Sequence, residues 1–364
     1  MRHNDRQENQ GERGQFLILF ALGLAVIMGF TALAIDAGLI YEDRRHLQNT
    51  ADAAALAGAA ELPGNPAAAK AKAEEWVLKH GLTTNDIKSI EVTSGLAAND
   101  TVRVEVRQDF GWIFARVLGM TTTEVNAKAA ARIGSYSGGN DFLPWALLTD
   151  DKACLDGNGQ PNYGSSCIVK VGAGDATTGW YGALDADGNG GGSAEYWDNI
   201  ADGEVDWAYC IAGDPAPGCA GAHTTIDPLD GNKVGPTDKG IEDRFAQGAQ
   251  CDANGNGKDD FSEVLSLNPG GNPTYLVSCP ESPWLIIIPI VSYTSVPVKD
   301  LTINGWMLAY LESYSCSTGG SNCASGKGHW EVNVSIIDAA YSQAAGFLGA
   351  YDPDAAIRLQ RLVE

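Results

Sequence analysis

The sequence predicts an α+β protein in which a long N-terminal membrane-spanning helix continues onto a small antiparallel-sheet unit, followed by a disulfide-braced, loop-rich β domain. Three observations predict this architecture. Residues 15–35 carry neither charge nor proline, residues 101–107 and 124–133 alternate between apolar and polar side chains, and all eight Cys lie between Cys154 and Cys323. An apolar run indicates a helix in lipid, alternation indicates half-buried strands, and clustered Cys indicate disulfides.

The apolar run is long enough to cross a bilayer. At ~1.5 Å per residue it covers about 30 Å, the thickness of the hydrocarbon core. No proline follows before Pro63, so we expect one helix over residues 15–62, with residues 1–14 as a short cytoplasmic stub. A cleaved secretory signal ending at Ala32-Leu33-Ala34 is the alternative, but such signals have apolar cores of only about 7–15 residues.

Small and apolar residues recur at helical spacing on one face of the second half of this helix. This Ala/Gly seam consists of Leu47, Ala51, Ala54, Gly58 and Leu62. Small residues let two backbones approach closely. Two interpretations stay open and can coexist: the seam docks on like helices or other partners, or it packs on the chain's own downstream domain.

Residues 63–134 are predicted to form a small α+β unit. Pro63-Gly64 ends the long helix, and Asn65 caps a second helix that begins at Pro66 and ends before Gly81. Periodicity then predicts a helix covering an antiparallel sheet, with strands over 87–93, 101–107 and 124–133 and a short amphipathic helix over 111–118.

Residues 135–140 are rich in Gly and Ser and are predicted to be a flexible linker to an acidic, Cys-containing, β-rich domain over 141–364. Pro289 lies inside an apolar run and predicts a bulge or an edge there. The C-terminal segment 339–364 fits either a closing strand or a short helix. The clearest strands of this domain are predicted at 167–171, 284–293, 301–313 and 329–337.

Charge and Cys are distributed unevenly. The chain carries a formal charge of -22, and residues 141–364 hold 30 acidic and 10 basic residues. This balance disfavours nucleic acid as a partner, because phosphate contacts need a basic surface. An even number of Cys indicates an oxidising compartment, so we expect the C-terminal domain to be extracytoplasmic or at the cell surface, with the N-terminus inside.

The disulfide connectivity is open in principle, because eight Cys allow 105 pairings. Short sequence separations favour sequential pairing. The predicted bridges are Cys154–Cys167, Cys210–Cys219, Cys251–Cys279 and Cys316–Cys323.

One loop fits the calcium pattern D-x-[DN]-x-[DN]-G-x5-E. Ca²⁺ prefers six to eight hard oxygen ligands, which alternate side chains of a tight loop can supply. The loop departs from the pattern in two ways: Asp259 stands where an apolar residue normally pairs with a second loop, and no helix-forming sequence clearly flanks Cys251. We therefore expect an isolated loop rather than a helix–loop–helix unit, and an acidic turn without metal is the alternative. The predicted ligands are Asp252, Asn254, Asn256, Lys258 through its carbonyl, Asp260 and Glu263.

Other candidate sites are weaker. Asp185-Ala186-Asp187-Gly188-Asn189-Gly190 opens like a second calcium loop, but Tyr196 stands where the closing Glu belongs. No nucleophile or phosphate-binding motif occurs, so we predict that the protein is not an enzyme. An aromatic cluster could bind carbohydrate or fill the core of the β domain. Its members are Trp180, Tyr181, Tyr196, Trp197, Trp207 and Tyr209.

The 49 residues from Gly11 to Ala59, which begin with Gly11-Glu12-Arg13-Gly14, resemble the Tad segment of the Tad/Flp pilus-assembly TadG-like family. The shared features are this motif, the apolar run, Asp36 at its end, Arg44-Arg45 and the Ala-rich stretch 51–58. Later phrases such as Leu143-Pro144-Trp145 look like other TadG-like chains.

The resemblance implies a single-pass envelope-anchored structural or assembly component of a Tad/Flp-type pilus system. Its implied partners are the membrane and pilus-assembly proteins or like helices, contacted through Ala51, Ala54 and Gly58, with a homo-oligomer as one form. The alternative is a calcium-dependent surface adhesin or carbohydrate-binding module tethered by its helix. An envelope hydrolase is a third hypothesis.

Overall fold

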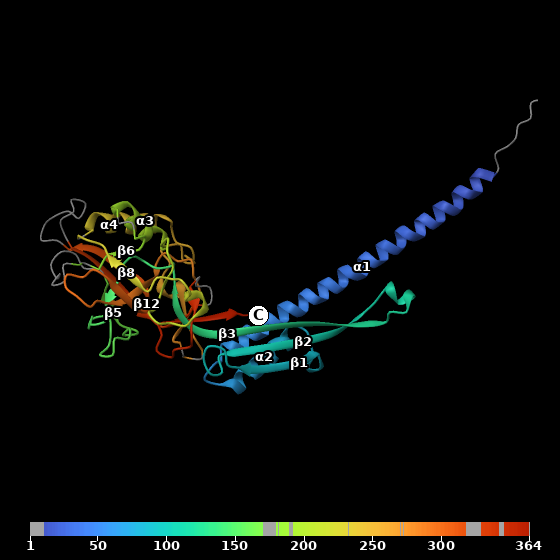
Figure 1. The fold of residues 1–364 in the computed structure, drawn as a ribbon, viewed down its shortest axis with the longest axis horizontal. Coiled ribbons are helices and arrows are strands. Elements are labelled where there is room, and N and C mark those ends of the chain that lie inside the picture. The colour runs from blue at the N-terminus through green and yellow to red at the C-terminus, as the bar shows by residue number, and fades with distance from the viewer. Residues whose placement is uncertain are drawn as a thin grey trace, which may run out of the picture.

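The protein combines one long helix with two sheets, as a computed structural model shows (Figure 1). This is the predicted α+β class. The structure describes residues 11–169, 180, 182–188, 192–231, 233–269, 271, 273–317, 329–341 and 346–363.

Helix α1 (Gly11–Ala59) is unbroken, as predicted. Its first half extends away from the rest of the protein, and its second half lies against the first sheet (Figure 1). Large apolar side chains on the first half, such as Phe16 and Phe30, are each 70% exposed. The helix is long and apolar enough to cross a membrane.

The small unit forms largely as predicted. Helix α2 (Pro66–Lys79) begins where the Asn65 side chain accepts a hydrogen bond from the Ala68 N–H. Strands β1 (Ile87–Thr93) and β2 (Thr101–Gly111) pair antiparallel, and β2 pairs in the same sense with the next strand. Helices α1 and α2 pack against each other and on this sheet.

Two predictions for this unit were wrong at their boundaries. The segment 111–118 does not form an amphipathic helix, because β2 continues to Gly111 and only Ala115–Leu118 form a 3₁₀ turn, η2. The third strand, β3 (Thr122–Gly139), is also much longer than the predicted strand over 124–133. The β2–β3 hairpin therefore reaches beyond α2 and lies beside α1, which extends farther still (Figure 1).

The prediction of a flexible linker at 135–140 was also wrong. Residues 135–139 belong to β3, which passes from the small unit into the second domain as one strand. Its end pairs with β15 (Phe347–Leu348) and β7 (Tyr209–Cys210). Small residues are needed here because β7 approaches β3 closely. A Cβ on Gly138 would lie within 3 Å of the Tyr209 carbonyl oxygen and the Cys210 Cα.

The C-terminal segment closes the first sheet. Of the two options left open for 339–364, the strand is confirmed: β16 (Ile357–Leu362) pairs antiparallel with β3 and parallel with β14 (Ala339–Ala340). The sheet order is β1-β2-β3-β16-β14-β10-β9, where β10 is Tyr275–Val277 and β9 is Leu265–Leu267. The small unit thus depends on a strand from the far end of the chain.

The second sheet has the central order β4-β11-β12-β13-β5. The predicted bulge lies beside Pro289, because the pairing of β11 with β12 shifts between Ile290 and Val291. Three of the four clearest predicted strands are confirmed nearly at their bounds, and β5 is shorter than predicted. The strands are β4 (Leu147–Leu148), β5 (Ser166–Ile168), β11 (Leu285–Ser292), β12 (Leu301–Ser317) and β13 (His329–Ile337), with β6 (Leu184–Asp185) and β8 (Thr225–Pro228) beside them.

Two helices, α3 (Ser193–Asp202) and α4 (Val234–Ala246), pack together in the second domain. Two short turns complete it, η3 (Pro217–Cys219) and α5 (Phe261–Val264), while η1 (Thr84–Asp86) belongs to the small unit. The bridges Cys154–Cys167, Cys210–Cys219 and Cys251–Cys279 are confirmed. The predicted bridge Cys316–Cys323 is not tested, because Cys323 lies outside the described residues.

A buried carboxylate holds the turn between β1 and β2. Asp100 is fully buried and accepts hydrogen bonds from the N–H groups of Gly95, Leu96 and Ala97 at 2.6 to 2.8 Å and from the Thr101 hydroxyl at 2.7 Å. Burial alone raises the pKa of Asp100, but these hydrogen bonds outweigh it and hold the pKa below its ordinary value.

Candidate functional site

The Ala/Gly seam packs on the chain's own small unit. Leu47, Ala51 and Ala54 are fully buried in a core shared with α2 and strands β2 and β3. A Cβ on Gly58 would lie 2.8 Å from the Ala69 carbonyl oxygen. Of the two interpretations left open, the intramolecular one is confirmed. The expectation that Ala51, Ala54 and Gly58 contact other molecules was wrong, because no seam surface is left uncovered.

Asp36, at the end of the apolar run, ties α1 to the β2–β3 hairpin. Its side chain is fully buried and accepts hydrogen bonds from the N–H groups of Ala115 at 2.7 Å, Phe114 at 3.1 Å and Ile113 at 3.2 Å. These N–H groups begin the η2 turn and lack partners within it. From the sequence, Asp36 is recognised only as a shared family feature, because the residues that it holds are 77 to 79 positions away.

The hairpin tip beside Asp36 exposes five large apolar side chains. We call them the apolar tip: Ile113, Phe114, Val117, Leu118 and Met120, which are 43 to 90% exposed. Sequence reasoning missed this surface because it treated 111–118 as a helix with one buried face. The available signal was that residues 110–123 contain a single charged residue, Arg116.

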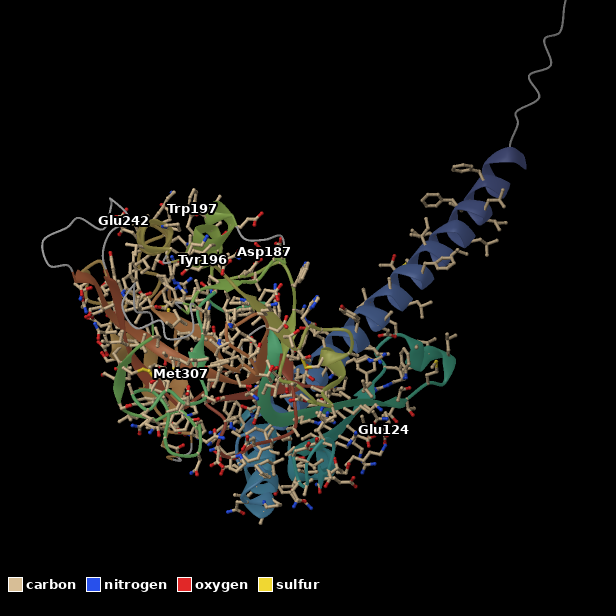
Figure 2. All side chains as sticks on the ribbon, turned by 60° about the vertical axis from the view of Figure 1, so that its left-hand side comes forward. Glu124, Asp187, Tyr196, Trp197, Glu242 and Met307 are labelled. Carbon is tan, nitrogen blue, oxygen red and sulfur yellow. A yellow bond between two sulfur atoms is a disulfide. The ribbon has the colours of Figure 1, made fainter. Side chains whose placement is uncertain are left out.

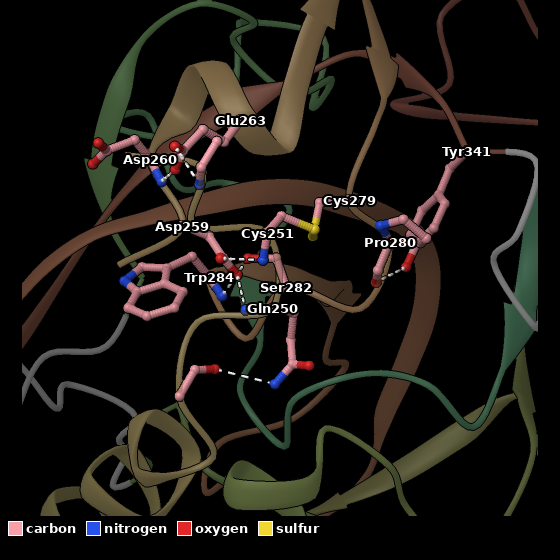
Figure 3. The surroundings of a disulfide bond; sticks show 12 residues. Gln250, Cys251, Asp259, Asp260, Glu263, Cys279, Pro280, Ser282, Trp284 and Tyr341 are labelled. Atoms are coloured by element: carbon pink, nitrogen blue, oxygen red, sulfur yellow. Dashed lines mark hydrogen bonds between the residues drawn. A yellow bond between two sulfur atoms is a disulfide. The ribbon is translucent and has the colours of Figure 1, made fainter. Parts of the chain in front are cut away.

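The predicted calcium loop is compact and braced by the Cys251–Cys279 bridge (Figure 3). Asp252 accepts hydrogen bonds from the N–H groups of Gly255 and Gly257, both at 2.7 Å, which fixes the turn. Gly255 and Gly257 have φ values of 77° and 83°, in the region that favours glycine.

The side chains of the predicted ligands meet in this loop. The amides of Asn254 and Asn256 both donate to Asp260 Oδ2, at 2.7 and 2.9 Å. Glu263 accepts from the Asp260 N–H at 2.8 Å and caps the α5 turn. The Lys258 ammonium lies 5.4 Å from the centre of the Tyr310 ring.

The arrangement is held by hydrogen bonds within the loop. Among the described residues, no group of three or more His, Cys, Asp or Glu side chains is placed to hold a metal ion. Asp259, the departure from the calcium pattern, is fully buried and accepts from the Cys251 N–H at 2.7 Å (Figure 3). It anchors the loop to the disulfide. Calcium binding stays a prediction.

The second calcium-like loop lies in a more buried place. Asp185 and Asp187 are 7% and 5% exposed, and Asn199 donates to Asp187 at 3.2 Å. Burial, together with neighbouring carboxylates, raises the pKa of Asp187 above its ordinary value. Asn189 and Gly190 lie outside the described residues.

Most of the aromatic cluster fills the core. Trp180, Tyr196 and Tyr209 are 7%, 2% and 2% exposed, and the Tyr196 hydroxyl accepts a hydrogen bond from the Trp145 indole at 2.9 Å. Trp207 stacks on His223 with 4.6 Å between ring centres. Trp197 is half-buried on α3 next to Tyr196 (Figure 2), and Tyr181 lies outside the described residues. The core interpretation therefore holds for three of these six residues.

A cavity of about 510 Å³ lies among β3, β12 and the segment before β16. Two carboxylates line it, and both support the fold. Asp214 accepts from the Ser137 hydroxyl at 2.7 Å, and Asp352 accepts from the Asp354 N–H at 2.9 Å. These hydrogen bonds give both acids a structural role. The absence of enzymatic activity remains a prediction.

The comparisons with known proteins concern the N-terminal segment. Residues 14–61 match the family model described as "Putative Flp pilus-assembly TadE/G-like". No curated protein and no solved structure matches the chain. The matched segment contains the apolar half of α1, Asp36 and the seam. The resemblance of this segment to the TadE/G-like family is thereby confirmed.

Proposed function

We propose that this protein is a single-pass, membrane-anchored structural or assembly component of a Tad/Flp-type pilus system, and not an enzyme. The match of residues 14–61 to the TadE/G-like model carries the proposal. The exposed apolar half of α1 supports the anchor, because uncovered apolar side chains over about 30 Å of helix are stable in lipid and not in water.

The proposed orientation places the N-terminus in the cytoplasm and the second domain outside. Three disulfides support it, since such bonds persist in oxidising compartments. Because the seam is covered, association with like helices or pilus-assembly proteins falls to the apolar half of α1 or to the surface of the second domain.

The test is deletion of the gene in its own host, followed by complementation. We expect loss of Tad pili in electron micrographs and restoration by the full chain. A matched pair of complementing variants, Leu22→Arg in the apolar half and Leu267→Arg on the exposed strand β9, separates anchoring from general damage. Leu22→Arg places a charge in lipid and should weaken both insertion and piliation, whereas Leu267→Arg should not. Normal pili in the deletion strain would overturn the proposal.

We also propose that the loop over 252–263 binds Ca²⁺. Its oxygen-rich donors, held by Asp252, Asn254, Asn256, Asp260 and Glu263, fit a hard cation. The two amides that now donate to Asp260 would present their oxygens after a half-turn of the amide group. In this proposal the carboxylates bind the ion, the disulfide holds the loop, and the ion has a structural role.

Calcium titration of the full chain in detergent tests the loop. An ion that binds only the folded state at 100 times its Kd stabilises it by about 2.7 kcal/mol. We expect Ca²⁺ to raise the melting temperature, and Asp252→Asn to remove this rise. Asp156→Asn is the matched control, because Asp156 accepts two N–H groups in a similar turn. No shift up to millimolar Ca²⁺ would contradict the prediction.

A further inference from the structure

We infer that the apolar tip of the β2–β3 hairpin inserts into the outer leaflet of the membrane beside α1, as a second point of attachment. The inference rests on the proposed function only in that α1 must cross the bilayer. The occupant of the tip's uncovered surface is then the acyl chains of lipid.

The first argument is continuity. A groove of about 380 Å³ separates the hairpin tip from α1, and every residue that lines it is apolar. The lining residues are Met28, Gly29, Ala32 and Leu33 of α1 and Phe114, Ala115, Val117 and Leu118 of the hairpin. One wall of the groove is thus the helix surface that faces lipid, and an acyl chain can fill the space between the two walls.

The second argument is depth. Asp36 ends the apolar run, and Leu33 and Met28 precede it by three and eight residues. At ~1.5 Å per residue they lie about 4.5 and 12 Å deeper along α1. A hairpin packed beside them therefore enters the hydrocarbon by a similar amount, which is close to the about 5–10 Å reached by interfacial segments.

The third argument is the distribution of charge on the hairpin. Behind the tip, Asp109 pairs with Glu124 across the strands, and Arg107 lies 3.3 Å from Glu124. Glu124 marks this charged stem in Figure 2. Over residues 110–123, which form the end of the hairpin, Arg116 is the single charged residue. An Arg side chain can extend its guanidinium back to the headgroups. Charge thus ends where the bilayer would begin.

The fourth argument is that the tip is held at a fixed height. Asp36 accepts hydrogen bonds from the N–H groups of residues 113, 114 and 115. Trp112 donates its indole N–H to the Thr123 hydroxyl at 2.8 Å, just behind the tip, where an amphipathic ring suits the membrane interface. The tip cannot move away from α1 without breaking the three hydrogen bonds to Asp36.

The test measures the contact of single positions with lipid in the full chain. A fluorescent amino acid that responds to its environment is placed at Val117, which is 90% exposed, at Val296 in the second domain, which is 62% exposed, or at Leu22 in α1. The protein is reconstituted into phosphatidylcholine vesicles whose lipids carry bromine near the headgroup end of the acyl chains.

We expect strong quenching and blue-shifted emission at position 117 and no quenching at 296. Adding Leu118→Asp should abolish the quenching at 117, whereas Leu267→Asp, at a residue with 73% exposure, should leave it unchanged. Quenching at 22 without quenching at 117 would overturn the inference and leave the anchor intact.

Two other outcomes also decide. Shielding of position 117 from soluble iodide that occurs only at high protein density, without quenching by lipid, would show that a second copy covers the tip, and would overturn the inference. No quenching at Leu22 would show that α1 is not in the bilayer, so the anchor and this inference would both fall.

Discussion

Gly58→Ala is the sharpest test of how the seam is used. A Cβ at this position would lie 2.8 Å from the Ala69 carbonyl oxygen and 3.2 Å from the Ala73 Cβ and Val102 Cγ1. The first contact is shorter than a real Cβ tolerates and involves backbone, so α1 and α2 must separate. Overpacking of this kind costs about 1–3 kcal/mol.

The matched control is Gly38→Ala on the same helix, where an added Cβ meets nothing within 4 Å. Replacing Gly by Ala in a helix stabilises it by about 1 kcal/mol at either site. The difference between the two variants therefore isolates the packing penalty of about 1–3 kcal/mol, or about 5- to 150-fold in an opening equilibrium.

Hydrogen exchange of the full chain in detergent, followed by mass spectrometry, measures this opening locally. We expect α2 and β2 to exchange faster in Gly58→Ala than in Gly38→Ala. If the amides of α2 exchange at the same rate in both variants, Gly58 is not a close-packing position and the intramolecular interpretation of the seam is refuted.

Three further predictions concern single contacts. Asp36→Ala should speed hydrogen exchange of residues 113–115 while α1 still resists carbonate extraction from membranes; unchanged exchange would show that the carboxylate does not hold the hairpin. Replacing both Cys251 and Cys279 by Ser should destabilise the second domain by roughly 3–4 kcal/mol, because the bridge closes a loop with a sequence separation of 28, and a denaturant midpoint equal to that of the wild type would contradict this. Because the folded-state pKa of Asp100 is lowered, its contribution to stability is present above about pH 4 and is lost as pH falls through the folded-state pKa. Acid should therefore destabilise the small unit less in Asp100→Asn than in the wild type, as thermal melts at descending pH would show.

Local chemistry determined much of this protein. The absence of charge and proline over residues 15–35 fixes a long apolar helix, because no local signal interrupts it. The strict alternation around Val104 fixes β2, and Asn65 with Pro66 fixes the start of α2. Short separations favoured the confirmed disulfides, since nearby Cys meet most readily. In the calcium-like loop, the pattern predicted which side chains meet but not whether an ion joins them.

Only the tertiary structure decided which surfaces remain uncovered. The residue pattern of the seam is the same whether it packs on the chain's own sheet or on another molecule. The close approach of Gly58 to Ala69 shows that it packs on its own chain. The return of β16 to β3, the passage of β3 through the supposed linker, and the contact of Asp36 with the hairpin all join residues far apart in sequence. Periodicity reports one element's own faces, whereas partners brought together across the chain decide which of those faces are buried.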